Sequence, residues 1–460
     1  MERLFGTDGV RGKAGRPPLD PPTIRRLGAA LTRTLRNGAR PVRLLSGRDT
    51  RESGPWIERE LAAGIRSEGG ELVSAGIIPT PAIAYLTPRM GFTAGVVISA
   101  SHNPYDDNGI KVFSGTGKKF TPVLEEQVEA IMADSSWDVP ADTRDDSQSY
   151  VVPGFSRAGI EQVDYRSEYL AHLAAILGSA EGHRHLRLAV DCANGATTTV
   201  APRLFEQLGF DITCLGCSPD GRNINRECGS TAPALLARTV VGGGYALGIA
   251  FDGDGDRAIF VDGAGRVVDG DAVLLMCAKR MQGEGRLTGN AVVATVMSNI
   301  GLEIGLKEAG IRLIRCPVGD KYVMEEMIAH GVSLGGEQSG HVIFSEYLFT
   351  GDGLATALNV LRTIQVAGRG LDDLASELPR YPQVLLNVRV DRRVDLETIP
   401  EVAGVLRSVE SRLAGHGRLL VRYSGTEPLL RIMLEGRDEA EIGKWGEEIV
   451  AAVKKHVKSQ

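Results

Sequence analysis

The sequence has 460 residues, more than one hydrophobic core usually organises, so we expect two to four compact domains. Hydrophobic residues make up 43% and charged residues 24%, a globular composition that excludes a disordered or fibrous protein. The net charge of −6, with both signs interspersed, gives no reason to expect a nucleic-acid partner, and no apolar stretch approaches the roughly 20 residues of a membrane-spanning helix.

The six cysteines are few for this length and show no paired disulfide pattern, which favours a reducing compartment. Cys214 and Cys217 have C-x-x-C spacing, but no histidine completes a zinc set, so we predict no structural metal there. A cytoplasmic location is therefore the expectation.

The first element in chain order is a glycine-rich motif, GTDGVRG, at residues 6–12. Glycines let the backbone approach a ligand closely, and Arg11 near the end of this motif could reach a phosphate. Because the motif begins at Gly6, we expect no cleavable presequence upstream.

An apolar run at residues 95–98 predicts a strand, and the motif SASHNP follows it. Its Asn-Pro pair marks a turn that would leave the Ser101 hydroxyl exposed at the strand end, where a serine can carry a phosphoryl group. Lys111, ten residues on, lies where a short strand could bring its ammonium back to the serine. A serine in a turn or a lysine on a strand is usually structural by itself. An acidic cluster further along the chain makes a functional site the better interpretation.

A second apolar run precedes the motif DGDGDR, which supplies three carboxylates two residues apart: Asp252, Asp254 and Asp256. The intervening glycines let all three turn inward toward a hard cation. An EF-hand calcium loop is excluded because Arg257 stands at its required glycine and Gly263 at its glutamate. The alternative is a solvated acidic turn, but three such carboxylates repel one another without a cation, and Mg²⁺ fits best.

A third apolar run leads into GGEQSGH at residues 335–341. Glu337, Ser339 and His341 offer the acceptor, hydroxyl and imidazole needed to grip a sugar and to move a proton. The nearby Asp352 lies in a similar glycine-flanked segment, but we interpret it as the N-cap of an amphipathic helix.

The pattern of apolar and polar residues changes near residue 370. Apolar patterns there predict strands at residues 385–390, 419–422 and 429–435 and an amphipathic helix at residues 438–457. These elements indicate a small α+β domain of a different design.

The motif RYSGTEP lies between two of these strands. A turn with small residues, hydroxyls and a guanidinium can form an anion nest, here from Arg422, Ser424, Gly425 and Thr426. This loop is expected to hold the phosphate that does not react. The alternative is a hairpin whose polar side chains face water.

In three places an apolar run of strand length is followed by a polar loop, and segments of helix length lie between these places. This pattern is typical of repeated α/β units. Ligands of such sheets bind at the carboxyl ends of strands, so the three loops could meet at one cleft. A polar stretch at residues 134–149 predicts a linker. We expect α/β domains at residues 1–150, 151–260 and 261–370, carrying the serine, acidic and sugar-recognition loops respectively, and an α+β domain at residues 371–460.

Taken together and in this order, FGTDGVRG, SASHNP with NGIK, FDGDGDR, GGEQSGH and RYSGTEP resemble the α-D-phosphohexomutase superfamily over essentially the whole chain. Further segments, DCANGA, ATVMSN and VGDKYV, are most similar to its bacterial phosphoglucosamine mutase branch. The resemblance implies three related mixed-sheet α/β domains and a C-terminal α+β phosphate-binding domain around a central cleft.

The resemblance also implies roles for individual residues. Ser101 would be the phosphoserine, and its phosphate would hold Mg²⁺ together with the three aspartates. Lys111 and His341 would be acid/base candidates, and Arg257 would lie beside the transferring phosphoryl group. Sugar and distal phosphate would be bound by Glu337, Ser339, Arg422, Ser424, Gly425 and Thr426.

The implied reaction interconverts glucosamine 6-phosphate and glucosamine 1-phosphate through a 1,6-bisphosphate, which also serves as activator, and supplies precursors of UDP-N-acetylglucosamine. Gln338 favours an amino sugar, while a phosphomannomutase or phosphoglucomutase remains the alternative. A non-catalytic sugar-phosphate sensor and a magnesium phosphatase are further alternatives. Expected partners are small hexose or hexosamine phosphates, with a homodimer allowed and no nucleic acid or membrane.

Overall fold

The computed structural model describes residues 3–6, 8–38, 41–139, 160–177, 186–390, 392–424 and 428–457. The chain divides into two compact units, one of residues 1–297 and 311–377 and the other of residues 298–310 and 378–460. Most of the predicted linker at residues 134–149 lies outside the described residues. Among the helices that are described, none is long and apolar enough to cross a membrane.

The first unit contains three sheets, and the first of them has six strands in the order β1-β5-β4-β2-β3-β6. The strands are β1 (Val10–Lys13), β2 (Arg43–Arg48), β3 (Glu71–Ile77), β4 (Ala94–Ile98), β5 (Asp107–Ser114) and β6 (Glu161–Gln162). Its helices are α1 (Pro21–Leu35), α2 (Gly54–Ser67), α3 (Thr80–Arg89) and α4 (Pro122–Ala133). Each of these helices has a proline in its first turn, where the missing N–H costs no hydrogen bond.

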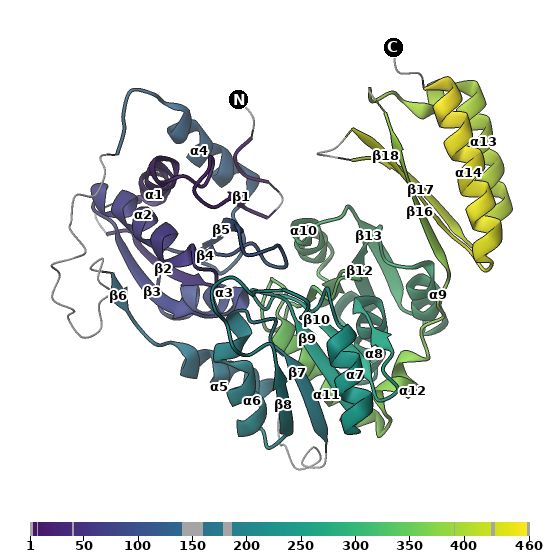
Figure 1. The fold of residues 1–460 in the computed structure, drawn as a ribbon, viewed down its shortest axis with the longest axis horizontal. Coiled ribbons are helices and arrows are strands. Elements are labelled where there is room, and N and C mark those ends of the chain that lie inside the picture. The colour runs from purple at the N-terminus through teal and green to yellow at the C-terminus, as the bar shows by residue number, and fades with distance from the viewer. Residues whose placement is uncertain are drawn as a thin grey trace. The chain divides into compact units, whose positions relative to one another are not determined.

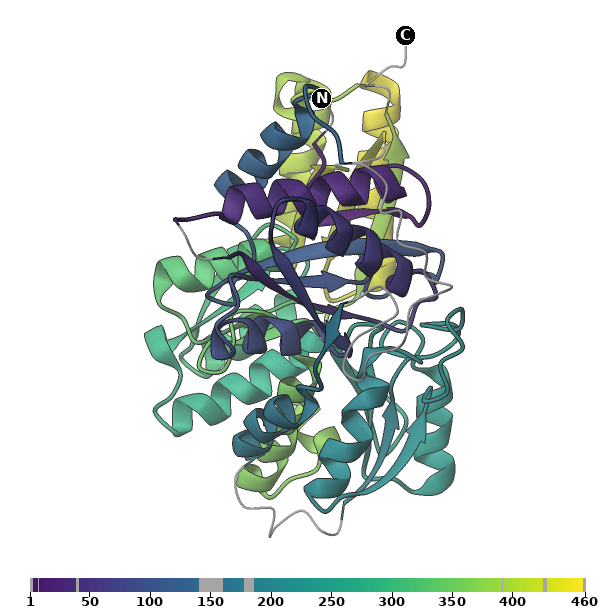
Figure 2. The same cartoon turned by 90° about the vertical axis from the view of Figure 1, so that its left-hand side faces the viewer.

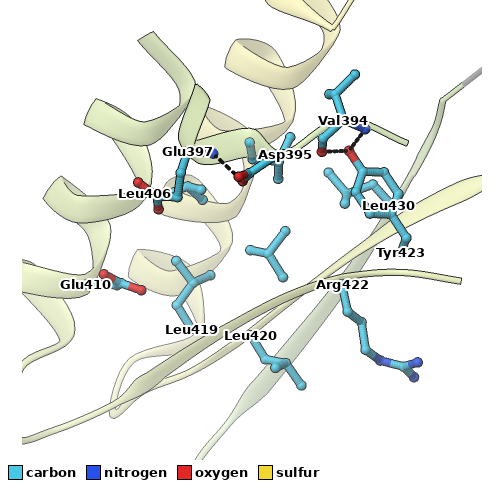
Figure 3. A pocket seen from close by; sticks show the side chains of 12 residues that line it. Val394, Asp395, Glu397, Leu406, Glu410, Leu419, Leu420, Arg422, Tyr423 and Leu430 are labelled. Atoms are coloured by element: carbon cyan, nitrogen blue, oxygen red, sulfur yellow. Dashed lines mark hydrogen bonds between the residues drawn. The ribbon is translucent and has the colours of Figure 1, made fainter. Parts of the chain in front are cut away.

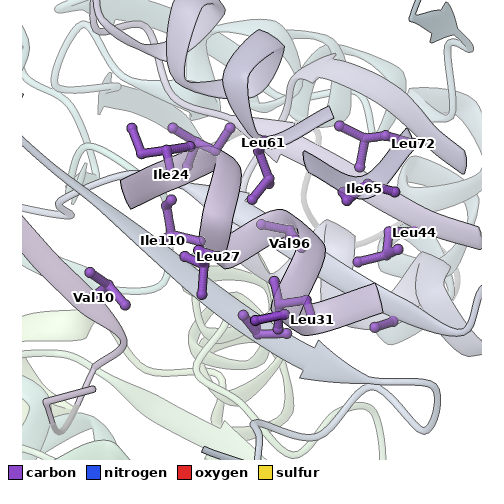
Figure 4. Packing of buried hydrophobic residues seen from close by; sticks show 14 of the residues in the cluster. Val10, Ile24, Leu27, Leu31, Leu44, Leu61, Ile65, Leu72, Val96 and Ile110 are labelled. Carbon is purple, nitrogen blue, oxygen red and sulfur yellow. The ribbon is translucent and has the colours of Figure 1, made fainter. Parts of the chain in front are cut away.

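Helices cover both faces of this sheet. Leucines and isoleucines of α1 and α2 pack with alternate strand residues such as Leu44 and Val96, as Figure 4 shows. On the opposite face a Cβ at Gly47 or Gly95 would lie within 3 Å of α3 side chains, so glycine lets α3 approach. Figure 1 shows the two layers of helix around the sheet, and Figure 2 shows the purple helices in front of it.

The second sheet runs in the order β11-β10-β9-β7-β8. It comprises β7 (Arg187–Asp191), β8 (Asp211–Leu215), β9 (Leu247–Phe251), β10 (Ala258–Asp262) and β11 (Val267–Val268), with helices α5 (Arg166–Leu177), α6 (Ala201–Gln207) and α7 (Ala234–Gly243). The third sheet, β13-β12-β14-β15, comprises β12 (Ala291–Thr295), β13 (Arg312–Cys316), β14 (Leu334–Gly336) and β15 (Val342–Phe344), with α8 (Gly270–Gly283), α10 (Asp320–His330), α11 (Gly353–Ala367) and α12 (Leu371–Ala375).

The three sheets share one topological device. In each, a strand paired in parallel is followed by a loop and then by an antiparallel neighbour: β4 and β5, β9 and β10, β14 and β15. The loops between them are SASHNP, DGDGDR and EQSGH, so each predicted site loop occupies the same place in its sheet. The predicted fold class, three related mixed α/β domains followed by an α+β domain, is confirmed.

The second unit has a three-stranded antiparallel sheet, β16-β18-β17. Its elements are β16 (Gln383–Arg389), β17 (Arg418–Tyr423), β18 (Leu429–Glu435), α9 (Ile300–Glu308), α13 (Pro400–Leu413) and α14 (Glu439–His456). The predicted strands and C-terminal helix are confirmed, with Ile442, Ile449 and Val453 of α14 buried in the core of this unit. The four domain boundaries stay a prediction.

The close packing of α1 on α2 gives a test of the fold. A Cβ at Gly64 of α2 would lie 1.8 Å from the Arg25 carbonyl oxygen of α1, so Gly64→Ala must push the helices apart. We expect a loss of about 1–3 kcal/mol in the free energy of unfolding, seen as a lower Tm. Gly242→Ala in α7, where a Cβ meets nothing within 4 Å, is the matched control and should not lower Tm. Equal Tm values for the two variants would contradict this packing.

Candidate active site

Ser101 lies in the loop after β4 in a strained conformation. Its φ of 51° places a non-glycine residue in the left-handed region, and its side chain is buried rather than exposed as the sequence suggested. Its Oγ donates a hydrogen bond of 2.5 Å to Oδ2 of Asp252 in the acidic loop after β9. The predicted nucleophile and the predicted metal ligands therefore meet.

A buried ion pair supports this loop, and the sequence analysis did not single it out. Arg51 pairs with Asp49 at 2.8 Å, and its Nη2 donates to the carbonyl oxygens of Ser101 and Asn103, both at 2.9 Å. Asn225 donates to the Ser101 carbonyl as well, at 2.9 Å. These donors, from loops that follow β2 of the first sheet and β8 of the second, hold the serine in its unfavourable conformation.

The acidic loop places three carboxylates in the interior. Asp252, Asp254 and Asp256 are 0%, 1% and 4% exposed, and one oxygen of each lies within 4.8 Å of the others. A Cβ at Gly253 would lie 2.6 Å from the Ser101 carbonyl oxygen, so glycine at this position lets the two loops touch. Burial and the two neighbouring carboxylates raise the pKa of Asp252 well above its usual value.

The donor set fits a hard divalent cation. Oδ1 of Asp254 and Oδ1 of Asp256 are buried, and within the described part of the chain neither accepts a hydrogen bond. Their Oδ2 atoms are used by protein donors: Thr80 donates to that of Asp254 at 2.7 Å, and Lys111 donates to both. Buried carboxylate oxygens without a donor are expensive unless a cation takes them, and oxygen ligands are those that Mg²⁺ prefers.

Lys111 and Arg11 are also brought to this cluster. Lys111 Nζ lies 2.9 Å from Asp254 and 3.3 Å from Asp256, while Arg11 donates to the carbonyl oxygen of Ala100 at 2.8 Å. Burial opposes the charge on Lys111, but the surrounding carboxylates outweigh it and raise its pKa well above the usual value. Lys111 is therefore an ammonium, and Arg11 anchors the residue before the serine.

The third loop docks against the acidic loop. The N–H of Ala258, directly after Arg257, donates to the Gly340 carbonyl at 3.1 Å. Nδ1 of His341 lies 3.7 Å from Asp256, and its Nε2 accepts the N–H of Gly351 at 3.0 Å, so Nε2 carries no proton. Burial lowers the pKa of His341, but Asp256 and other carboxylates raise it by more, so the pKa lies above its usual value.

Glu337 and Ser339 lie in this same third loop. Glu337 is 9% exposed and accepts the N–H of Gly319 at 3.2 Å and the hydroxyl of Ser339 at 3.4 Å. Asp352 caps α11, as predicted, by accepting the N–H of Ala355, and Tyr169 donates to its other oxygen at 2.8 Å. Burial raises the pKa of Asp352 to about 6.

Arg422 and Ser424 lie at the end of the β17–β18 hairpin in the second unit, and Gly425 and Thr426 lie outside the described residues. The Tyr423 hydroxyl donates to the Val394 carbonyl at 2.8 Å (Figure 3). That contact fixes the neighbouring Arg393, whose guanidinium donates to the Ser424 carbonyl at 2.6 Å. Burial and the nearby Arg431 lower the pKa of Arg422, so cations gather at this end of the hairpin.

A pocket of about 430 Å³ lies beside this hairpin (Figure 3). Asp395, Glu397 and Glu410 line it together with leucines and Arg422. Three carboxylates repel a phosphate, so the hairpin end and not this pocket suits an anion.

The residues that the sequence analysis missed share one property: their partners are far along the chain. Arg51 reaches Ser101 and Asn103, Asn225 reaches the same loop, and Asp8 contacts Lys111 and Lys119. Only the position of these residues in the sequence could have indicated a role: Arg51 lies just after β2, and Asp8 lies inside the first glycine-rich motif.

Family profiles described as phosphoglucomutase/phosphomannomutase match the chain in four places. Alpha/beta/alpha domains I, II and III match residues 2–138, 167–265 and 269–381, and the C-terminal domain matches residues 385–452. A curated relative from Solibacter usitatus (strain Ellin6076), named phosphoglucosamine mutase, is 46% identical over 454 residues, which cover 99% of each chain.

Solved structures share the fold at lower identity. A phosphoglucomutase/phosphomannomutase family protein from Burkholderia thailandensis superposes with a TM-score of 0.79 at 23% identity, covering 99% of this chain and 98% of the other. N-acetylphosphoglucosamine mutase from Aspergillus fumigatus, solved with GlcNAc-6P and magnesium, gives a TM-score of 0.63 at 19% identity, covering 90% and 83%. The four profile matches and the full-length relative agree with the site geometry, and the chain belongs to the phosphoglucomutase/phosphomannomutase family within the α-D-phosphohexomutase superfamily.

Proposed function

We propose that the protein is an isomerase that interconverts glucosamine 6-phosphate and glucosamine 1-phosphate through a phosphoserine at Ser101 and a 1,6-bisphosphate. The observation that carries this proposal is the hydrogen bond from the Ser101 hydroxyl to Asp252, which joins a strained nucleophile to three buried carboxylates. The choice of amino sugar follows the phosphoglucosamine mutases that are similar over the full chain.

In one half-reaction, the bond between the serine oxygen and phosphorus breaks while a bond from the sugar O1 to phosphorus forms. Lys111, held as an ammonium, is the acid for the departing serine oxygen. His341 is the candidate base for the sugar hydroxyl, for which its Nε2 must exchange the N–H of Gly351 for that hydroxyl. Arg257 and Arg11 would offset charge on the phosphoryl group. The bisphosphate then turns over and returns its O6 phosphoryl group to Ser101.

The three aspartates and the Ser101 phosphate would hold Mg²⁺, which supplies charge neutralisation at the phosphoryl oxygens. Support comes from the Oδ1 atoms of Asp254 and Asp256, which accept no hydrogen bond within the described residues, and from the magnesium in the Aspergillus fumigatus structure. Glu337 and Ser339 would bind sugar hydroxyls. Arg422, Ser424, Gly425 and Thr426 are proposed to bind whichever phosphate is not reacting.

The proposal places the enzyme in the cytoplasm, where it would supply precursors of UDP-N-acetylglucosamine. Its partners would be hexosamine and hexose phosphates, with the 1,6-bisphosphate as activator and a homodimer as a candidate assembly. A phosphomannomutase or phosphoglucomutase activity is the second candidate, since the same phosphoryl chemistry serves neutral sugars.

Replacement of the nucleophile tests the covalent route. Ser101→Ala should lower turnover by at least about 1,000-fold, because the hydroxyl that carries the phosphoryl group is removed, while the Kd for glucosamine 6-phosphate changes little. Ser114→Ala, at the far end of β5, is the control and should retain activity. Turnover that persists in Ser101→Ala would rule out the phosphoserine.

Removal of one carboxylate tests the metal site. Asp254→Asn keeps the shape of the side chain but loses its charge, so affinity for Mg²⁺ should fall by about tenfold or more in a calorimetric titration. Asp220→Asn, in an exposed loop, is the control and should bind Mg²⁺ as the unsubstituted protein does. Unchanged affinity in Asp254→Asn would move the cation to another site.

Substrate choice is tested by comparing kcat/KM for glucosamine 6-phosphate with the values for glucose 1-phosphate and mannose 1-phosphate. The enzyme is assayed with Ser101 phosphorylated and Mg²⁺ present. We expect a preference for the amino sugar of about tenfold or more, since a site built around a polar group rejects analogues that lack it. Parity would retain the phosphoserine chemistry and favour a general phosphohexomutase.

A further inference from the structure

Asp8 is a carboxylate of the first glycine-rich motif with no role assigned so far. Its Oδ2 lies 3.1 Å from Lys111 Nζ and also accepts a hydrogen bond from Arg11, and its Oδ1 lies 2.7 Å from Lys119 Nζ. Burial opposes ionisation of Asp8, but these cations outweigh it and hold the pKa of its carboxyl far below the usual range. One carboxylate thus joins three cations.

Two of these cations reach the reacting groups. Arg11 donates to the carbonyl oxygen of Ala100, next to Ser101. Lys111 donates to the Oδ2 atoms of Asp254 and Asp256, two of the proposed metal ligands. Asp8 is therefore linked to the nucleophile loop through one residue, Arg11, and to the metal loop through one residue, Lys111.

The position of Lys111 creates a competition. Its ammonium lies 2.9 Å from Asp254 and 3.3 Å from Asp256, so it and a divalent cation are attracted to the same two carboxylates and repel each other. Asp8 is the third carboxylate around the ammonium, at a comparable distance. It offsets part of the charge of Lys111 without being one of the proposed metal ligands.

We propose that Asp8 is a positioning residue that fixes the Lys111 ammonium and the Arg11 guanidinium and thereby keeps Asp254 and Asp256 open to the divalent cation. The inference rests on the proposed metal-assisted phosphoryl transfer. It differs from a purely structural ion pair because Asp8 must act through Lys111, so the effect of its removal must depend on whether Lys111 is present.

The test titrates Mn²⁺ into the full-length protein and its Asp8→Asn, Lys111→Met and double variants, with the phosphorylation state of Ser101 matched by mass spectrometry. Asp8→Asn should weaken Mn²⁺ binding by about tenfold, because the ammonium then rests on the metal carboxylates alone. Lys111→Met should tighten binding, because the competing charge is gone. With Lys111→Met already present, Asp8→Asn should change the affinity by less than about threefold.

A kinetic comparison gives a second readout. Asp8→Asn should lower kcat by about 100-fold while KM stays within about threefold, since misplaced cations impair transfer more than binding. Asp106→Asn is the matched control: Asp106 also pairs with a lysine, Lys13, but at the surface, and its loss should leave both constants unchanged.

Each outcome decides the matter. Equal losses of Mn²⁺ affinity from Asp8→Asn with and without Lys111, or weaker binding in Lys111→Met, would overturn the inference. If Asp8→Asn does not fold, Asp8→Ser takes its place in the same comparison with and without Lys111. If Mn²⁺ binds but glucosamine phosphates are not turned over, only the proposed substrate is rejected. If Mn²⁺ does not bind, the proposed metal-assisted function and the inference about Asp8 are both rejected.

Discussion

Three carboxylates are buried side by side at the end of β9, and their mutual repulsion has to be offset. Two unit charges about 4 Å apart interact by several kcal/mol in a protein environment, so this loop cannot fold as an isolated acidic turn. The surrounding chain supplies the compensation. Lys111 comes from β5, Thr80 donates from the start of α3, and the Ser101 hydroxyl donates from the loop after β4. The acidic loop thus determines where three distant segments must lie.

The topology of the three sheets places the site loops where they can contact one another. Each of the three site loops connects a strand paired in parallel to an antiparallel neighbour, so each leaves its sheet at the carboxyl end of a buried strand. Contact between loops is then made by backbone groups, as in the bond from Ala258 to Gly340, and by glycines such as Gly253 that remove a side chain from the interface. Repetition of one topology gives three loops with compatible geometry.

Much of the fold and of the candidate site could be predicted because the residues that form each loop are contiguous in the sequence. The acidic loop is visible in six residues, because alternating Asp and Gly after an apolar run has few structural explanations, and the C-terminal strands follow from their alternation. Burial of Ser101 was not foreseen, since exposure at a strand end was inferred from the Asn-Pro turn alone. Arg51, Asn225 and Asp8 act on segments far away in the sequence, and periodicity and spacing carry no information about such partners.

The division of labour between the loops bears on how substrate choice can change. In the proposed mechanism, Ser101, the three aspartates and the cations around them act on a phosphoryl group, which every hexose phosphate carries in the same form. None of these groups distinguishes an amine from a hydroxyl at the sugar C2. Discrimination must therefore come from groups that contact the sugar, and we propose this role for the loop that carries Glu337, Ser339 and the half-buried Gln338. Because Gln338 is held there through its main chain, its carbonyl accepting the N–H of Gly270 at 3.0 Å, its side chain can be exchanged without moving the acidic loop. In this arrangement the preference for one sugar can change by substitution in this loop while the residues proposed for phosphoryl transfer stay the same.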